Sequence, residues 1–74
     1  MEAKVGKIYQ HYKGKKYFVS NIVKHTETKE ELVVYRPYST NLSGLVEEQW
    51  ARPRAMFEEE IVVNGEKIHR FKIL

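Results

Sequence analysis

Hydrophobic residues along this chain recur in short runs rather than with a helical period. No window shows the i, i+3, i+4, i+7 apolar stripe of an amphipathic helix. The chain instead breaks into segments rich in Val, Ile, Tyr and Phe, separated by turn residues, which is typical of an all-β protein. The segments lie at residues 7–12, 16–24, 32–35, 45–52, 61–63 and 67–74.

Turn residues separate these segments where hairpins require them. Gly14 lies between the first two segments and can adopt the positive φ of a tight turn. Asn64-Gly65 separates the last two and predicts a two-residue hairpin, because both residue types tolerate positive φ. The polar stretches at residues 25–31 and 39–44 predict loops.

Two prolines predict where a strand ends and where a helical turn begins. Residues 32–35 are apolar on both faces, which indicates the most buried strand, and Pro37 predicts its end or an edge position. Pro53 suits the first position of a helix and predicts a single helical turn through Phe57.

These elements predict one all-β domain that covers residues 1–74. We expect a small antiparallel SH3-like barrel, or a strongly bent sheet, of five to six short strands with one helical turn. Closing the sheet into a barrel would remove the unpaired edge strands of so small a protein.

The amino-acid composition indicates the cellular compartment of this domain. The chain contains no cysteine, which excludes disulfides and thiolate metal sites and fits a reducing compartment. Its first residues lack the apolar segment of a signal peptide. No apolar run approaches the roughly 20 residues needed to span a bilayer. We therefore expect a cytoplasmic protein without membrane association.

The formal charge of +3 is unevenly distributed. Residues 1–24 carry six lysines against one glutamate, and residues 67–74 carry three basic residues and no acidic one. Residues 25–66 carry nine acidic and four basic residues. If the two ends of the chain pair in space, they form one positive surface.

Histidine is the first candidate for acid–base or metal chemistry. His11, His25 and His69 are far apart in the sequence, and no pair has metal-ligand spacing. The chain also contains no aspartate. We predict no metal, no other cofactor and no catalytic residue, and the sequence favours a non-enzymatic protein.

Aromatic and basic residues interleave at residues 9–13 and 15–18. This mixture can stack bases and neutralise phosphates. The structural alternative is that the aromatic residues fill the core while the lysines lie on the other face. Under the first interpretation, the candidate nucleic-acid-binding residues are Lys13, Lys15, Lys16, Arg70 and Lys72.

Residues 50–53 form a second cluster, Trp50-Ala51-Arg52-Pro53. A tryptophan beside arginine and proline can line a peptide-binding groove. It can equally anchor the core, with Arg52 stacked on a ring. The sequence leaves both interpretations open.

Five ordered motifs add a family resemblance. They are Tyr9-x-His11-Tyr12-Lys13-Gly14, His25-x-Glu27-Thr28, Glu31-Leu32-Val33-Val34-Tyr35-Arg36, Trp50-x-Arg52-Pro53 and Met56-Phe57. In these motifs the chain resembles the small bacterial proteins of domain-of-unknown-function family 1653. The resemblance implies a β domain that commonly stands alone and no known activity. It marks nine candidate ligand-binding residues: His11, Tyr12, Lys13, His25, Thr28, Tyr35, Arg36, Trp50 and Arg52.

Three functions remain open at this point. The leading hypothesis is a binding module for nucleic acid or a nucleotide-like anion. The alternatives are a protein-interaction module that uses the groove at residues 50–53, and a small-molecule sensor or enzyme built around His11 and His25. Convergence of His11, His25, Tyr35 and Trp50 on one concave surface would favour a small-molecule site. The oligomeric state does not follow from the sequence.

Overall fold

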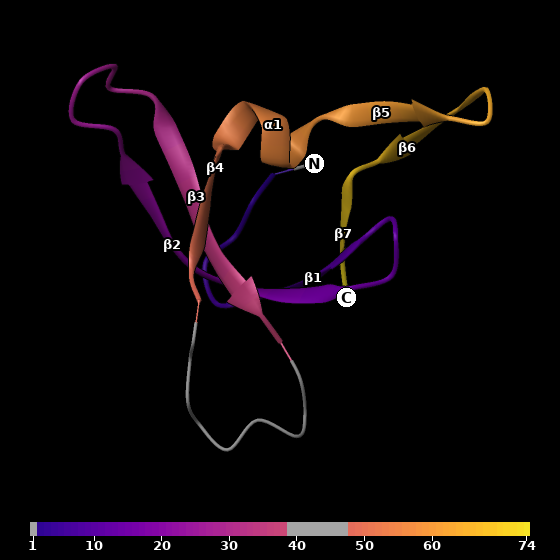
Figure 1. Cartoon of the computed structure of the whole chain (residues 1–74), viewed down its shortest axis with the longest axis horizontal. Coiled ribbons are helices and arrows are strands. Elements are labelled where there is room, and N and C mark those ends of the chain that lie inside the picture. Colours follow the sequence, from indigo (N-terminus) through magenta and orange to yellow (C-terminus); the bar gives the residue numbers. More distant parts are fainter. Residues whose placement is uncertain (1, 39–47) are drawn as a thin grey trace.

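The computed structural model of the chain describes residues 2–38 and 48–74. These residues form seven strands and one short helix (Figure 1). In chain order the elements are β1 (Ile8–His11), β2 (Lys16–Lys24), β3 (Glu31–Pro37), β4 (Trp50–Pro53), α1 (Arg54–Glu58), β5 (Glu60–Val63), β6 (Glu66–His69) and β7 (Phe71–Ile73). Among the described residues, no helix has the length and apolar character needed to cross a membrane.

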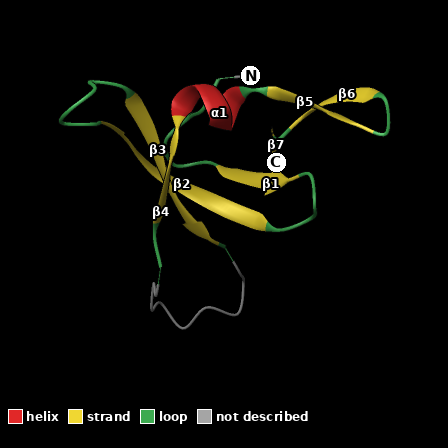
Figure 2. Cartoon of the chain, turned by 45° about the horizontal axis from the view of Figure 1, so that its top comes forward, coloured by secondary structure: helices red, strands yellow, loops and turns green. Residues whose placement is uncertain are grey.

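Five strands form one antiparallel sheet in the order β4-β3-β2-β1-β7. The long strands β2 and β3 make its centre, and their register shifts between Val19 and Asn21. Such an irregularity bends a strand and increases its twist. The predicted bent sheet is confirmed (Figure 2). The predicted barrel is not formed in the described part of the chain, because β4 and β7 lie at opposite edges of an open sheet.

Strands β5 and β6 form a separate two-stranded sheet that projects from the body of the molecule (Figures 1 and 2). Asn64 and Gly65 connect them with φ angles of 52° and 81°. The predicted hairpin is therefore confirmed. The segment at residues 67–74, predicted as one run, is instead divided at Arg70, and its two halves join different sheets.

The core is mostly aromatic and lies on one face of the five-stranded sheet. Its buried residues are Ala3, Tyr9, Tyr17, Val19, Val33, Tyr35, Phe57 and Phe71. The Phe57 ring from α1 stacks on Phe71 with centroids 4.1 Å apart, and Tyr9 meets Phe57 edge-on at 5.3 Å. Offset and edge-on ring pairs add stability beyond the burial of their area. Of the interleaved aromatic residues, Tyr9 and Tyr17 thus supply the core, whereas Tyr12 is exposed and Phe18 lies on the outer face.

The two prolines lie at or next to the strand and helix ends that the sequence predicted for them. Pro37 is the last residue of β3, as predicted. Pro53 is the last residue of β4 and the N-cap of α1, one position before the helical start expected for it. The loop predicted at residues 39–44 and the strand start at residues 45–46 lie outside the described residues.

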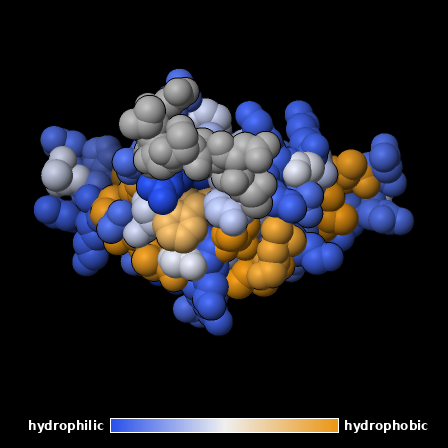
Figure 3. Space-filling model, turned by 90° about the horizontal axis from the view of Figure 1, so that it is seen from below, coloured by the Kyte–Doolittle hydropathy of each residue, from blue (hydrophilic) through white to orange (hydrophobic). Residues whose placement is uncertain are grey.

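Apolar and hydrophilic residues are unevenly distributed over the surface. In the view from below, apolar residues lie mostly in the middle of the face and hydrophilic residues surround them (Figure 3). The sheet alternates core-facing and outward-facing residues, so the outer face carries Ile8, Phe18 and Val34, each half-buried.

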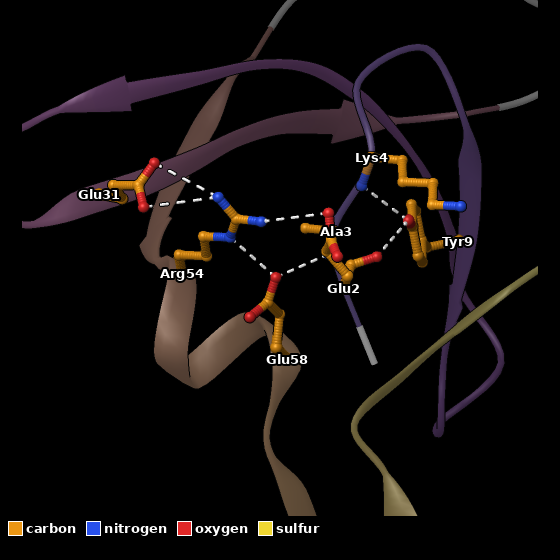
Figure 4. Close-up of polar contacts among 7 residues, drawn as sticks. All are labelled: Glu2, Ala3, Lys4, Tyr9, Glu31, Arg54 and Glu58. Atoms are coloured by element: carbon orange, nitrogen blue, oxygen red, sulfur yellow. Dashed lines mark hydrogen bonds and ion pairs between the residues drawn. The ribbon is translucent and has the colours of Figure 1, made fainter.

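Arg54 forms ion pairs with glutamates from the N-terminal segment, the start of β3 and α1 (Figure 4). Its Nε donates to Glu58 Oε2 at 2.8 Å within α1, and its Nη1 lies 3.3 Å from Glu31 Oε2 at the start of β3. Glu58 Oε2 also accepts the backbone N–H of Ala3 at 2.7 Å. The same arginine lies 3.8 Å from Glu2. These contacts hold the N-terminal segment against α1 and the sheet.

Candidate functional site

A pocket of about 300 Å³ opens beside the aromatic core. We call it the aromatic pocket. Four of its lining residues are aromatic and four are basic: Tyr17, Tyr35, Trp50 and Phe71, with His11, Lys13, Lys15 and Arg52. Among the described residues, no carboxylate lines it. The lining therefore combines flat apolar surface with positive charge.

Strand register explains why residues so distant in sequence meet here. His11 pairs with Phe71 across β1 and β7, and Tyr35 pairs with Trp50 across β3 and β4. Paired residues share one face of an antiparallel sheet, and so do residues two apart in a strand. Arg52 therefore lies on the same face as Trp50. Together these strands bring side chains from both ends of the chain to one concave surface.

The rings of the aromatic pocket meet one another at steep angles. Tyr17 and Tyr35 are buried and meet edge-on, with centroids 5.2 Å apart at 86°. Trp50 stands perpendicular to Tyr35 at 6.0 Å and is 39% exposed. Its indole Nε1 donates to Glu48 at 3.1 Å, which fixes the edge of the ring. The pocket thus offers ring surfaces in crossed orientations.

Basic groups surround these rings. The Arg52 guanidinium lies over the Phe71 ring at 5.5 Å. Lys13 and Lys15 come from the β1–β2 turn (residues 12–15), where Gly14 has a φ of 109°. This φ favours glycine and lets the chain reverse within a few residues. The turn therefore supplies two lysines to the lining of the pocket.

His11 lies between the rings and the basic groups. Its ring meets Phe71 edge-on at 5.1 Å, and its Nδ1 accepts the backbone N–H of Lys13 at 3.2 Å. The proton of the neutral ring is therefore on Nε2. Partial burial lowers the pKa of His11 below 6.5, and the nearby charges of Arg52, Arg70 and Lys13 lower it further. These charges mark the pocket as electropositive.

Tyr17 also responds to its surroundings. Burial raises the pKa of its hydroxyl above 10.0, with a smaller contribution from Tyr35, although Arg52 opposes the shift. The Tyr17 hydroxyl is accordingly neutral at physiological pH, and it can donate a hydrogen bond to an anion.

Six residues from the two predicted candidate sets line the aromatic pocket. They are His11, Lys13, Lys15, Tyr35, Trp50 and Arg52. The sequence did not single out Tyr17 and Phe71 as site residues. The signal for Tyr17 was its place in the interleaved segment at residues 15–18, but only the pairing of Tyr17 with Tyr9 fixes which face it occupies.

Two predicted candidates lie elsewhere, in the turn between β2 and β3. His25 Nδ1 accepts the backbone N–H groups of Glu27 and Thr28 at 3.0 and 3.3 Å. The Thr28 hydroxyl accepts the N–H of Glu30 at 3.2 Å. Their polar atoms therefore stabilise the turn. Of the four residues expected to converge on a small-molecule site, His11, Tyr35 and Trp50 line the aromatic pocket and His25 does not.

The other candidates also lie outside the aromatic pocket. Arg36 lies over Phe18 at 5.0 Å on the outer face of the sheet, where Phe18 pairs with it. Lys16 follows Lys15 but pairs with Gln10 on that outer face. Arg70 forms an ion pair with Glu59. Tyr12 and Lys72 line a different pocket, described below.

The two basic ends of the chain do lie side by side, because β1 pairs with β7. The condition for one positive surface is thus met by the fold. Within residues 2–38 and 48–74, no three His, Cys, Asp or Glu side chains come together in a group that could hold a metal ion.

Comparison with known proteins adds a family. Residues 7–73 match the family described as "Protein of unknown function (DUF1653)". A similar solved structure is that of a DUF1653 protein from Bordetella bronchiseptica, with 26% sequence identity and a TM-score of 0.72. The match covers 92% of this chain and 83% of that chain. Among curated proteins, no relative matches. These findings confirm the resemblance seen in the five motifs, and they carry no activity.

Proposed function

The chain belongs to the DUF1653 family of proteins of unknown function, and we propose that it is a binding module for a nucleotide-like anion. The aromatic pocket is the proposed site. The observation that carries the proposal is its lining of four aromatic and four basic side chains, with no carboxylate among the described lining residues.

Each half of such a ligand has a matching surface. Stacking of a base on an aromatic side chain contributes about 1–3 kcal/mol, and Trp50 is the most exposed ring of the pocket. A phosphate can accept two parallel N–H bonds from the planar guanidinium of Arg52. Lys13 and Lys15, which also line the pocket, supply further positive charge. The base and the phosphate would therefore contact different side chains, the base Trp50 and the phosphate Arg52 and the two lysines.

Aromatic pockets also bind cations, so the charge of the ligand needs a separate argument. Ring faces attract a quaternary ammonium group through their quadrupole. In the aromatic pocket Arg52, Lys13 and Lys15 would repel such a group, and no described lining residue carries the opposite charge. The Glu48 carboxylate touches only the edge of Trp50, where it accepts the indole N–H. An anion is therefore favoured.

The size of the aromatic pocket supports a ligand of one nucleotide. Small-molecule sites have volumes of about 300–1,000 Å³, and this pocket lies at the lower limit.

The chain has no cysteine, which fits a reducing compartment, and we propose the bacterial cytoplasm as the place of action.

A protein-interaction module is the second candidate. Strand β4 lies at the edge of the sheet, and its Trp50 is 39% exposed. An extended peptide could pair with such an edge and place a side chain beside Trp50. Peptide binding would depend on Trp50 but not on Lys15, whereas nucleotide binding would depend on both.

The fluorescence of Trp50 tests the leading proposal, because it is the only tryptophan in the chain and lines the pocket. We expect thymidine 5′-phosphate to change this fluorescence saturably and thymidine to bind about tenfold more weakly, since it lacks the phosphate. Arg52→Gln should weaken binding of thymidine 5′-phosphate and leave that of thymidine nearly unchanged.

Neighbouring lysines provide the matched control. Lys15→Gln should weaken binding of the phosphate ligand, whereas Lys16→Gln removes the same charge from the outer face and should not. Equal affinity for the nucleoside and the nucleotide, or no response in a protein shown by circular dichroism to be folded, would contradict the proposal.

A further inference from the structure

A second pocket, of about 550 Å³, lies beside the first. We call it the second pocket. Its lining residues come from β1, the β1–β2 turn, β6 and β7: Gln10, His11, Tyr12, Gly14, Ile68, His69 and Lys72. None of them is acidic, and three can carry positive charge. The function proposed above does not use this pocket.

The two pockets are contiguous at His11, which lines both. Successive residues of the β1–β2 turn also alternate between them. Lys13 and Lys15 line the aromatic pocket, whereas Tyr12 and Gly14 line the second pocket. The turn therefore forms the partition between two sites that open next to each other.

Ring contacts continue across this partition. Trp50 lies 5.8 Å from Tyr17, and Tyr17 lies 6.0 Å from Phe71. Phe71 meets His11 at 5.1 Å, and His11 meets Tyr12 at 4.6 Å with a tilt of 34°. Tyr12 is 40% exposed at the far end of this series. Ring surface is thus available in both pockets, with His11 between them.

Positive charge lies where two joined nucleotides would need it. The Lys13 ammonium is 5.8 Å from the centre of the Tyr12 ring, at the partition itself. Lys72 also lines the second pocket. A phosphate that links a base in one pocket to a base in the other would pass over the turn and meet Lys13.

Acidic groups near the second pocket are few and partly neutralised. Glu59 is paired with Arg70, which follows β6. Glu60 pairs across β5 and β6 with His69 and is the nearest opposing charge by register. The charge balance at this surface therefore still favours an anion.

We propose that the two pockets are adjacent nucleotide subsites of one binding site for single-stranded nucleic acid. The inference rests on the function proposed above, because it assigns the aromatic pocket to the first nucleotide. The ligand is single-stranded, since in a duplex the base faces are stacked on one another and cannot enter either pocket.

Chain length tests this proposal directly. Trp50 fluorescence is titrated with thymidine 5′-phosphate, then with the 5′-phosphorylated dinucleotide and trinucleotide of thymidine. We expect the dinucleotide to bind at least about tenfold more tightly than the mononucleotide, because a second base stacks and a second phosphate is neutralised. The third nucleotide should add little. The salt slope of the dinucleotide should be steeper by about 0.7.

Substitutions in the second pocket test whether it causes the higher affinity for the dinucleotide. His69→Gln with Lys72→Gln should abolish the difference between dinucleotide and mononucleotide and leave the affinity for the mononucleotide unchanged. Lys67→Gln is the matched control, because Lys67 is an exposed lysine of β6 that does not line the second pocket. It should keep the full gain.

The outcomes separate the two proposals. Equal affinity for one and two nucleotides, or a gain that survives the double variant, would overturn the second subsite and leave the nucleotide pocket standing. Binding of no ligand in the folded protein would overturn both. Tighter binding of a duplex than of the single strand would show that the backbone alone is recognised and would also overturn the two-subsite proposal.

Discussion

His11 is the residue whose protonation the site controls most directly. Burial and the charges of Arg52, Arg70 and Lys13 hold its pKa below 6.5, so the free protein carries a neutral ring at neutral pH. The depressed pKa also means that folding stability is lost as pH falls below 6.5, because the unfolded chain binds the proton more readily. An anion in the aromatic pocket would reverse this bias by favouring the imidazolium form.

Anion binding should therefore couple to proton uptake by His11. We expect the affinity for thymidine 5′-phosphate, relative to a His11→Gln variant, to rise severalfold as pH falls from about 7.5 to about 5.5, because the imidazolium form attracts the phosphate. Comparison with the variant cancels the titration of the phosphate itself, which has a pKa near 6. Parallel pH profiles for the two proteins would show that His11 does not contact the anion.

At the scale of elements, the β5–β6 hairpin stands apart from the rest of the fold. It forms its own two-stranded sheet, and Val62 on one side is 67% exposed. An isolated hairpin is only marginally stable in water. Its order therefore depends on the turn at Asn64-Gly65 and on its junction with β7, where Arg70 pairs with Glu59.

Gly65→Val should loosen this hairpin locally. Gly65 has a φ of 81°, and a Cβ there would meet no atom within 4 Å, so the strain comes from the backbone alone. We expect a cost of about 1–2 kcal/mol, seen as faster hydrogen exchange in β5 and β6 with little change in β2 and β3. Gly65→Asn should cost less, because asparagine tolerates positive φ. Unchanged exchange in the valine variant would show that the turn does not control the hairpin.

At the scale of the whole molecule, the contacts of Arg54 and Glu58 close the fold around the core. Partial burial pushes the pKa of Glu58 upward, but the N–H of Ala3 and the guanidinium of Arg54 outweigh it and hold the pKa below 4.5. A carboxylate with a depressed pKa contributes stability above its unfolded pKa and loses it as pH falls through the folded value. This contribution thus disappears on the acid side of pH 4.5.

Glu58→Gln should remove that contribution. We expect the variant to be less stable than the parent by about 1–2 kcal/mol at pH 7, with the difference shrinking as pH falls below 4.5. Urea unfolding at several pH values measures it. Glu27→Gln, in the exposed turn between β2 and β3, is the control and should change little. A difference that does not depend on pH would show that the charge of Glu58 is unimportant.

Local features of the sequence predicted much of the backbone. Gly14 and Asn64-Gly65 reverse the chain as expected, and Pro37 ends β3, because these residues restrict or widen their own φ and ψ. The motifs likewise identified the family. The family resemblance, by contrast, named His25 and Thr28 as ligand-binding candidates, and only the structure shows that their side chains accept neighbouring backbone N–H groups in the turn.

The sequence by itself determined the all-β class, the turns at Gly14 and Asn64-Gly65, the aromatic composition of the core and the excess of basic residues at both ends of the chain. Only the tertiary structure decided that the sheet stays open, that residues 67–74 divide between two sheets, and that Lys15 faces the pocket while Lys16 does not. The reason is physical. Turns depend on the φ and ψ of single residues, whereas a pocket depends on the register of strands distant in sequence, and a shift of one residue moves every side chain to the opposite face.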